Sequence, residues 1–200
     1  MIPVNFEILS RAMLFYQKKG YKYIDVPWAV SKPIADLTRP PGALEFPYRN
    51  DMLVASGEQS FLQLIVDGKL PKGKYICVTP CFRDETDITE GSRWFFMKAE
   101  LINTSDTSIK ALIEMFECAQ EFFNHYLPTN LLTTGHSSYD IMSGEAIELG
   151  SYGIRNEPAT GPWIYGTGCA EPRLSYAIDF HKQRIKQVLG TSKLTDPESW

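Results

Sequence analysis

Two apolar segments separated by a short polar one constrain the fold of this chain more than any other feature of its sequence. Residues 75–85 and 93–102 have the composition and the alternation of β-strands, and residues 86–92 between them are polar. Strands this close in sequence pair with each other as an antiparallel hairpin. We therefore expect an antiparallel sheet built around this hairpin.

The predicted hairpin places charged and aromatic side chains on shared faces. Because side chains alternate along a strand, Arg83 and Glu85 point the same way, and on the second strand so do Phe96, Lys98 and Glu100. A guanidinium can bind phosphate or carboxylate oxygens, and a carboxylate can accept from an exocyclic amine. An aromatic ring beside them could stack on a purine. An Arg and a Glu two residues apart are more often a surface ion pair, so the spacing alone leaves both interpretations open.

The remaining segments predict further strands and helices. Apolar residues at helical spacing predict helices over residues 5–19, 59–66, 105–126 and 173–189. Alternating segments predict short strands over residues 21–26, 52–55, 139–142 and 146–154. Since turns rather than helical crossovers join most strands, the predicted fold class is α+β, an antiparallel sheet flanked by helices. We expect residues 1–200 to form a single domain with one core.

Local signals also predict the boundaries of two segments. Ser105 and Asp106 are candidate caps for the longest helix, because their side chains can accept from free backbone N–H groups. Residues 32–50 are predicted to lack regular structure, since they contain Pro33, Pro40, Pro41 and Pro47. We interpret this segment as a connection within the domain.

The charge balance excludes some classes of partner. Charged residues make up 22% of the chain with a net charge of −4, so any nucleic-acid contact must be local.

The longest segment without Asp, Glu, Lys or Arg, Phe122 to Tyr139, contains Pro128 and cannot span a bilayer. The amino terminus has no basic segment followed by an apolar run. We expect a soluble cytoplasmic protein with no membrane partner.

The four cysteines do not indicate a disulfide framework or a zinc site. If Cys77 and Cys81 lie on one strand, about 3.3 Å per residue separates them by about 13 Å, too far for one tetrahedral zinc. We interpret both as reduced structural thiols.

Three segments, in this order, resemble the three signature motifs of class II aminoacyl-tRNA synthetases. The first is the helix from Phe6 to Gly20, followed by a strand that ends at Pro27. The second is Phe82-Arg83-Asp84-Glu85, a loop, and Phe96 to Glu100. The third is glycine-rich, Gly166-Thr-Gly-Cys-Ala-Glu-Pro-Arg173, and ends at the head of a helix. The resemblance spans about residues 5–189 and implies a class II catalytic domain.

Within that class the sequence is most similar to seryl-tRNA synthetases. Their Pro-Cys-Phe-Arg-x-Glu is matched by Pro80 to Glu85, and their Thr-x-Glu loop resembles Ser56-Gly57-Glu58. Their Tyr-Asp and Glu-x-x-Ser resemble Tyr139-Asp140 and Glu148 to Ser151. Each match is short, and their common order carries the resemblance.

The resemblance implies a role for each matching residue. Arg83 would hold the α-phosphate and the substrate carboxylate, Glu85 the adenine amine, Phe96 the adenine ring and Arg173 the γ-phosphate. The substrate amino acid would be bound by Ser56, Glu58, Glu100 and Thr167. Magnesium, which prefers oxygen ligands, would be held by Glu148 and Ser151. From the residues alone, Glu58 could instead be a helix N-terminal charge, Phe96 a core residue, and Glu148 with Arg173 an ordinary salt bridge.

These roles imply ATP-dependent activation of a small amino acid, serine first, to an aminoacyl-adenylate. The acceptor could be tRNA or a carrier protein, because the first motif begins about five residues from the start and leaves no room for the coiled-coil arm of seryl-tRNA synthetases. Tyr165, where those enzymes usually have Asn, is expected to narrow the pocket floor. The first motif implies a homodimer. The alternatives are a non-catalytic regulatory protein that binds ATP or an amino acid, and a structural dimer subunit.

Overall fold

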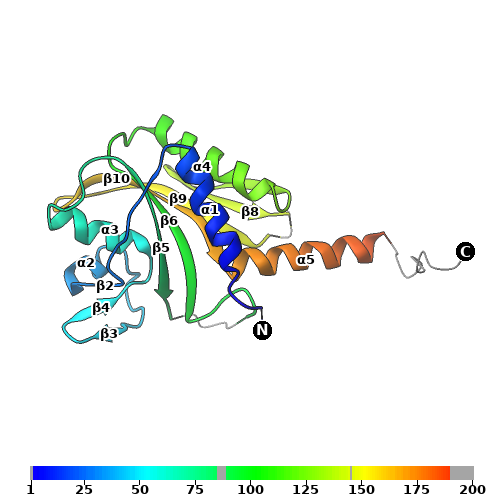
Figure 1. Ribbon diagram of the computed structural model, residues 1–200, viewed down its shortest axis with the longest axis horizontal. Coiled ribbons are helices and arrows are strands. Elements are labelled where there is room, and N and C mark those ends of the chain that lie inside the picture. Colours follow the sequence, from blue (N-terminus) through cyan, green and yellow to red (C-terminus); the bar gives the residue numbers. More distant parts are fainter. Residues whose placement is uncertain (1, 85–88, 145, 190–200) are drawn as a thin grey trace, which may run out of the picture.

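The computed structural model describes residues 2–84, 89–144 and 146–189 (Figure 1). Within these ranges seven strands form one sheet in the order β1-β5-β6-β10-β9-β8-β7. β1 pairs parallel with β5, and the other pairs are antiparallel. The strands are β1 (Lys22–Tyr23), β5 (Lys74–Phe82), β6 (Phe95–Asn103), β7 (Thr129–Gly135), β8 (Ser138–Ser143), β9 (Glu148–Glu157) and β10 (Gly161–Glu171).

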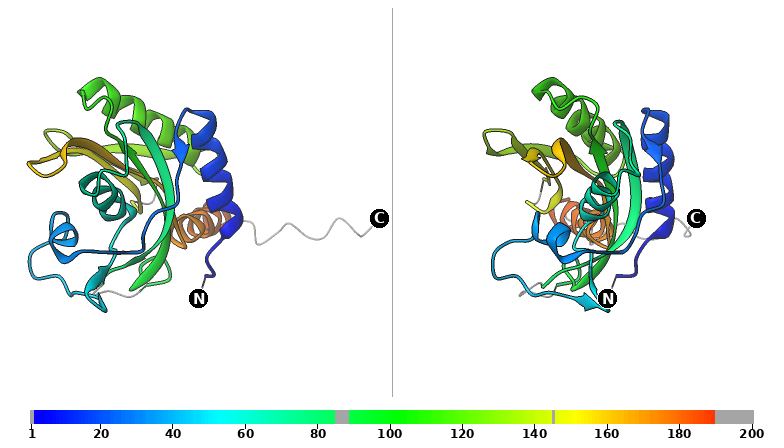
Figure 2. Two further views of the ribbon diagram at one scale, coloured as in Figure 1. Left: turned by 60° about the vertical axis from the view of Figure 1, so that its left-hand side comes forward. Right: turned by 90° about the vertical axis from the view of Figure 1, so that its left-hand side faces the viewer.

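Helices cover both faces of this sheet. α1 (Phe6–Lys18), α4 (Ile109–Asn124) and the first turns of α5 (Arg173–Val188) pack on one face. α3 (Gly57–Val66) lies on the other, so that α1 and α3 are on opposite sides of the central strands (Figure 2). The predicted α+β class, an antiparallel sheet flanked by helices, is confirmed.

The face that carries α3 also holds a smaller sheet and a short helix. The small sheet has the order β2 (Ala29–Val30), β4 (Asp51–Leu53) and β3 (Pro47–Tyr48). α2 (Lys32–Asp36) follows β2. The prediction that residues 32–50 lack regular structure was therefore wrong at both ends. Pro33 lies in the first turn of α2, where a helix needs no backbone N–H, so this proline favours the helix start.

Side-chain caps fix the helix boundaries. The Asn5 side chain accepts from the backbone N–H groups of the first turn of α1, as a cap should. α4 begins at Ile109 with Ser108 as its cap, so the prediction of Ser105 and Asp106 as caps was wrong. The Asn103 side chain accepts from the backbone N–H groups of Ser105 and Asp106, which places both in a turn before the helix.

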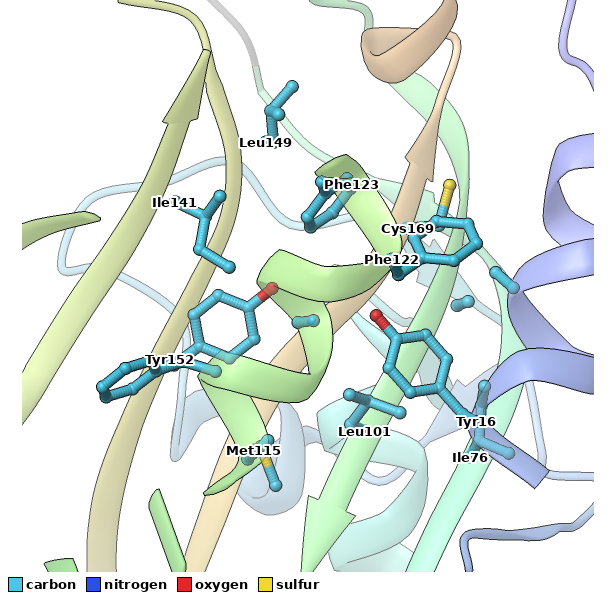
Figure 3. Close-up of a cluster of buried hydrophobic side chains, with 14 of the residues drawn as sticks. Tyr16, Ile76, Leu101, Met115, Phe122, Phe123, Ile141, Leu149, Tyr152 and Cys169 are labelled. Atoms are coloured by element: carbon cyan, nitrogen blue, oxygen red, sulfur yellow. The ribbon is translucent and has the colours of Figure 1, made fainter. Parts of the chain in front are cut away.

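Two buried tyrosines anchor the middle of β10 to the main core (Figure 3). The β10–β6 register shifts between Thr167 and Cys169, which interrupts the ladder there. Tyr152 donates its hydroxyl to the Thr167 carbonyl at 2.5 Å, and Tyr16 donates to the Gly168 carbonyl at 2.9 Å. The core therefore supplies the hydrogen bonds that the interrupted ladder does not.

Several strand boundaries differ from the prediction. The first hairpin strand ends at Phe82, so Arg83 lies just beyond it, and Glu85 falls outside the described residues. The strand predicted over residues 21–26 is only the two-residue β1. Neither β7 nor β10 was predicted as a strand. Among the described residues, no helix is long and apolar enough to cross a membrane.

Candidate active site

A cavity of about 460 Å³ opens on the α3 side of the large sheet. One wall is formed by the loop after α2, which contributes Arg39 and Leu44, and the floor comes from β6, β9 and β10. The wall carries four cationic and four acidic side chains: Arg39, Arg83, Lys98, Arg155, Glu58, Asp84, Glu100 and Glu148. The cavity wall is therefore highly charged, with equal numbers of cationic and acidic side chains.

Six of the predicted site residues line this cavity, although they come from four separate segments. They are Ser56, Glu58, Arg83, Glu100, Glu148 and Ser151. Phe96, Thr167 and Arg173 lie beside the cavity rather than on its wall. Glu85 cannot be placed, because it lies outside the described residues.

Arg83 is held in place by a backbone carbonyl and an aromatic ring. Its Nε donates to the Ala55 carbonyl at 3.0 Å, and its guanidinium carbon lies 5.3 Å from the centre of the Phe96 ring. No carboxylate of the described part of the chain forms an ion pair with it, in contrast to the other cations of the wall. Arg83 is thus positioned to meet an anion in the cavity.

Glu100 is a buried carboxylate with unused hydrogen-bonding capacity. Its side chain is only 1% exposed, and Lys98 Nζ lies 2.9 Å from its Oε2. The geometry of that ion pair is not that of a hydrogen bond. Across the described ranges, Glu100 Oε2 is the one buried side-chain oxygen or nitrogen without a hydrogen bond. A Cβ on Gly57 would lie 2.9 Å from the Glu100 Cβ, so only glycine lets α3 approach β6 this closely.

Glu58 is almost buried and is held by two donors. Trp163 Nε1 donates to its Oε1 at 2.7 Å, and Arg155 donates to its Oε2 at 2.7 Å. The Arg155 guanidinium also stacks over the Tyr165 ring at 4.2 Å. Burial raises the pKa of Glu58, and the Arg155 charge opposes this rise. The interpretation of Glu58 as a helix N-terminal charge is also compatible with its place in the first turn of α3.

Glu148 and Arg173 form an ion pair at the edge of the cavity, with 3.2 Å between Arg173 Nη1 and Glu148 Oε1. Both also line a smaller neighbouring cavity of about 180 Å³, together with Ser92 and Tyr176. The ordinary salt bridge considered from the sequence is therefore present in the structure.

Thr167 and Phe96 support the wall from behind. Thr167 is buried, and its hydroxyl accepts from the backbone N–H of Ser151 at 3.4 Å, which helps to position that residue. Phe96 packs with Cys81 in a small apolar cluster. Cys77 and Cys81 are buried and free on β5, and burial raises the pKa of both thiols, as expected of structural cysteines.

The oxygens near Ser151 suit a hard cation only in part. Ser151 pairs with Asp140 across β8 and β9. Burial raises the pKa of the Asp140 carboxyl, and the hydrogen bond from Ser151 opposes this rise. No group of three or more His, Cys, Asp or Glu side chains arranged for a metal occurs in the described ranges. Glu148 and Ser151 could therefore hold a magnesium ion only together with oxygens from a ligand, which is how Mg²⁺ usually binds beside phosphates.

Sequence reasoning missed Arg155 and Trp163 and assigned no role to Lys98. No motif marks Arg155, and its only signal is alternation, since Ser151, Gly153 and Arg155 share one face of β9. The pairing of Arg155 with Trp163 across β9 and β10 became visible only with the strand register.

Comparison with known proteins links this arrangement to one fold. No protein-family model and no curated protein sequence matches the chain. A pyrrolysyl-tRNA synthetase of Desulfitobacterium hafniense superposes with a TM-score of 0.71 at 14% identity, over 88% of this chain and 67% of that one. A cytoplasmic serine-tRNA ligase of Naegleria fowleri, solved with AMP, superposes with a TM-score of 0.65 at 17% identity, over 86% of this chain and 52% of that one. The chain thus spans about half the length of the ligase. Both neighbours contain class II catalytic cores, and the fold of this chain is that of a class II aminoacyl-tRNA synthetase catalytic domain.

Proposed function

We propose that this chain, whose fold is that of class II synthetase catalytic domains, uses ATP to activate a small uncharged amino acid, serine first, as an aminoacyl-adenylate. The observation that carries the proposal is the meeting of six of the ten predicted site residues on one charged cavity in this fold. We propose that residues 1–200 form one catalytic unit and that two copies of it act together as a homodimer. The Naegleria fowleri ligase with AMP supports a nucleotide site.

Arg83 is the proposed ligand of the reacting anions. It lines the cavity with its charge uncompensated by any described carboxylate, whereas Lys98 and Arg155 are each paired. A guanidinium in this state binds a carboxylate or a phosphate through several N–H donors at once. The substrate carboxylate and the α-phosphate of ATP are the two anions that must meet in the reaction, and Arg83 would hold both.

Glu100 is the proposed partner of the substrate ammonium. A buried carboxylate oxygen without a hydrogen bond is costly, and an ammonium group of a ligand would supply the missing donor. Ser56 lines the same cavity and would assist with its hydroxyl. Glu58 would contribute negative charge from behind, since its two oxygens already accept from Trp163 and Arg155.

The proposed chemistry needs no protein nucleophile. A carboxylate oxygen of the amino acid attacks the α-phosphorus of ATP, and the bond from that phosphorus to the bridging oxygen breaks. Pyrophosphate leaves with the electron pair. The site contributes orientation of the two anions and compensation of the charge that develops between them. Phe96 and Glu85 remain the proposed contacts of the adenine, and Arg173 that of the γ-phosphate.

Magnesium fits the site as an ion shared with the triphosphate. Glu148 and Ser151 would hold it through oxygen, and it would neutralise phosphate charge and so ease the departure of pyrophosphate. Glu148 would then exchange its contact with Arg173 for the ion, which frees Arg173 to bind phosphate.

The test is amino-acid-dependent exchange of labelled pyrophosphate into ATP, screened over the standard amino acids. We expect exchange with serine or another small uncharged amino acid and none without an amino acid. Binding of ATP or an amino acid by calorimetry without any exchange would favour the non-catalytic regulatory alternative. Transfer of the activated amino acid to tRNA or to a carrier protein would be measured separately, with each acceptor added to the enzyme that holds the aminoacyl-adenylate.

A further inference from the structure

The cavity has an order along its length that the strand register defines. Arg83 comes directly after the last residue of β5, Phe82. Phe82 pairs with Phe95, so Arg83 lies at the level where β6 begins. Glu100 lies farther along β6, and the side chains of Arg83 and Glu100 both reach the same cavity. Tyr165 pairs with Ile102, farther still in the same direction. Arg83, Glu100 and Tyr165 therefore follow one another from one end of the cavity to the other.

Arg155 and Glu58 form the wall at the Tyr165 end. The Arg155 guanidinium lies over the Tyr165 ring and donates one N–H to Glu58, and the Arg155 side chain is 38% exposed. Its remaining N–H groups make no hydrogen bond to the residues that the structure describes. Each Glu58 oxygen accepts a single bond, which leaves lone pairs available. This wall thus presents hydrogen-bond donors and acceptors side by side, with no net charge.

We propose that the Glu58–Arg155 pair determines which amino acid side chain enters: an uncharged side chain that both donates and accepts hydrogen bonds is selected, and acidic and basic side chains are excluded. The inference rests on the proposed function, because a substrate with its carboxylate at Arg83 and its ammonium at Glu100 directs its side chain to this wall.

The exclusion follows from the pairing. An acidic side chain would add a third carboxylate beside Glu58 and Glu100, while the charge of Arg155 is already used by Glu58. A basic side chain would meet the Arg155 guanidinium across the cavity. Removal of either partner would leave the other with an uncompensated charge on the cavity wall, where it would attract a side chain of the opposite charge. Without Arg155, Glu58 should favour a basic substrate side chain. Without Glu58, Arg155 should favour an acidic one.

The test uses two pairs of amino acids matched in size, asparagine with aspartate and serine with 2,3-diaminopropionate. Pyrophosphate exchange and calorimetric binding are measured for the wild type, Glu58→Gln, Arg155→Met and the double variant. We expect Glu58→Gln to shift preference from asparagine toward aspartate, and Arg155→Met from serine toward 2,3-diaminopropionate. Each shift should be roughly 10-fold or more, the factor that one charge-assisted hydrogen bond provides.

The double variant is the matched control, because it restores neutrality and should lose both acquired preferences. Circular dichroism of each variant verifies folding, and Arg155→Lys, which keeps the charge, should retain the wild-type ranking if Arg155→Met does not fold. An unchanged ranking in both single variants, or a wild type that prefers aspartate or 2,3-diaminopropionate, would overturn this inference while leaving adenylate formation intact. Binding that follows the expected ranking without any exchange would instead overturn the proposed function alone. The absence of both binding and exchange would overturn both.

Discussion

Replacement of Arg83 by alanine should abolish exchange while the protein stays folded. The side chain donates one hydrogen bond to Ala55 and lies over the Phe96 ring. A hydrogen bond contributes about 0.5–1.5 kcal/mol and an exposed cation–π contact about 0.5–1 kcal/mol, so the loss of stability should be about 1–2.5 kcal/mol. For a chain of this size that lowers the Tm by about 2–10 °C. Domains are usually stable by about 5–15 kcal/mol, so the variant remains folded at assay temperature.

The expected effect on the rate is much larger than the effect on folding. Arg83 is the wall cation without a described carboxylate partner, and removal of one transition-state donor typically costs about 10²-fold or more in rate. Pyrophosphate exchange under saturating substrates measures this loss, and a thermal melt measures stability in parallel.

Arg39→Ala is the matched control, because Arg39 lines the same cavity but is paired with Asp36 and Glu45. It should reduce exchange far less. Arg83→Lys, which keeps the charge but not the fork of donors, should fall between the two. Equal losses in Arg83→Ala and Arg39→Ala, or wild-type exchange by Arg83→Ala, would refute the assignment of Arg83 as the ligand of the reacting anions.

Three further predictions concern assembly and stability. The wild type should sediment as a dimer of 22.7 kDa chains, and a monomer at micromolar concentration would contradict this. The variant Leu14→Asp changes a 53% exposed position of α1 and should give folded monomers. Tyr152→Phe should lose about 1–3 kcal/mol in urea unfolding because the buried Thr167 carbonyl loses its donor, and an unchanged midpoint would show that this bond contributes nothing. Burial raises the pKa of Glu171 above its ordinary 4.5, so its contribution to stability is fully present below that pH and is lost as the pH rises through the folded-state pKa. The free energy of unfolding of the wild type relative to Glu171→Gln should therefore decline over that range, and a difference independent of pH would exclude such a shift.

The sequence predicts well where periodicity and burial agree. The hairpin of β5 and β6 alternates because one face packs under α1, while the other packs against α3 and lines the cavity. Phe96, Lys98 and Glu100 consequently share a face, as predicted. β7 was missed for the opposite reason: six of its seven residues are exposed, so burial imposes no alternation on it.

The glycine-rich β10 shows why local propensity misleads. Glycine is unfavourable in strands, yet a Cβ on Gly166 would lie 2.6 Å from the Tyr152 ring, and one on Gly168 would lie 2.9 Å from the Tyr16 ring. The two tyrosines occupy the space that side chains would need. This requirement arises from packing between distant segments, and no window of neighbouring residues contains it.

The same limit applies to the candidate site. Motif order predicted Arg83, Glu58 and Glu100 as site residues because each belongs to a short recognisable pattern, and all three line one cavity. Arg155 belongs to none, and its importance depends on its pairing with Glu58, which is distant in the sequence. Whether a charge is paired is decided by the fold, and among the residues that the structure describes this distinction separates Arg83 from Arg155.

Strand β7 leaves one edge of the large sheet open, since no strand among the described residues pairs with its outer side. Its sequence, Thr129 to Gly135, contains no charge and no proline, and both Leu131 and Leu132 are exposed. Natural edge strands usually carry lysine, proline or a bulge that blocks pairing with another molecule. Here a register shift between Thr133 and Gly135 is the only such interruption within the strand. At high concentration this edge should recruit strands from other copies and lead toward aggregation, and Leu131→Lys is the substitution that would protect it.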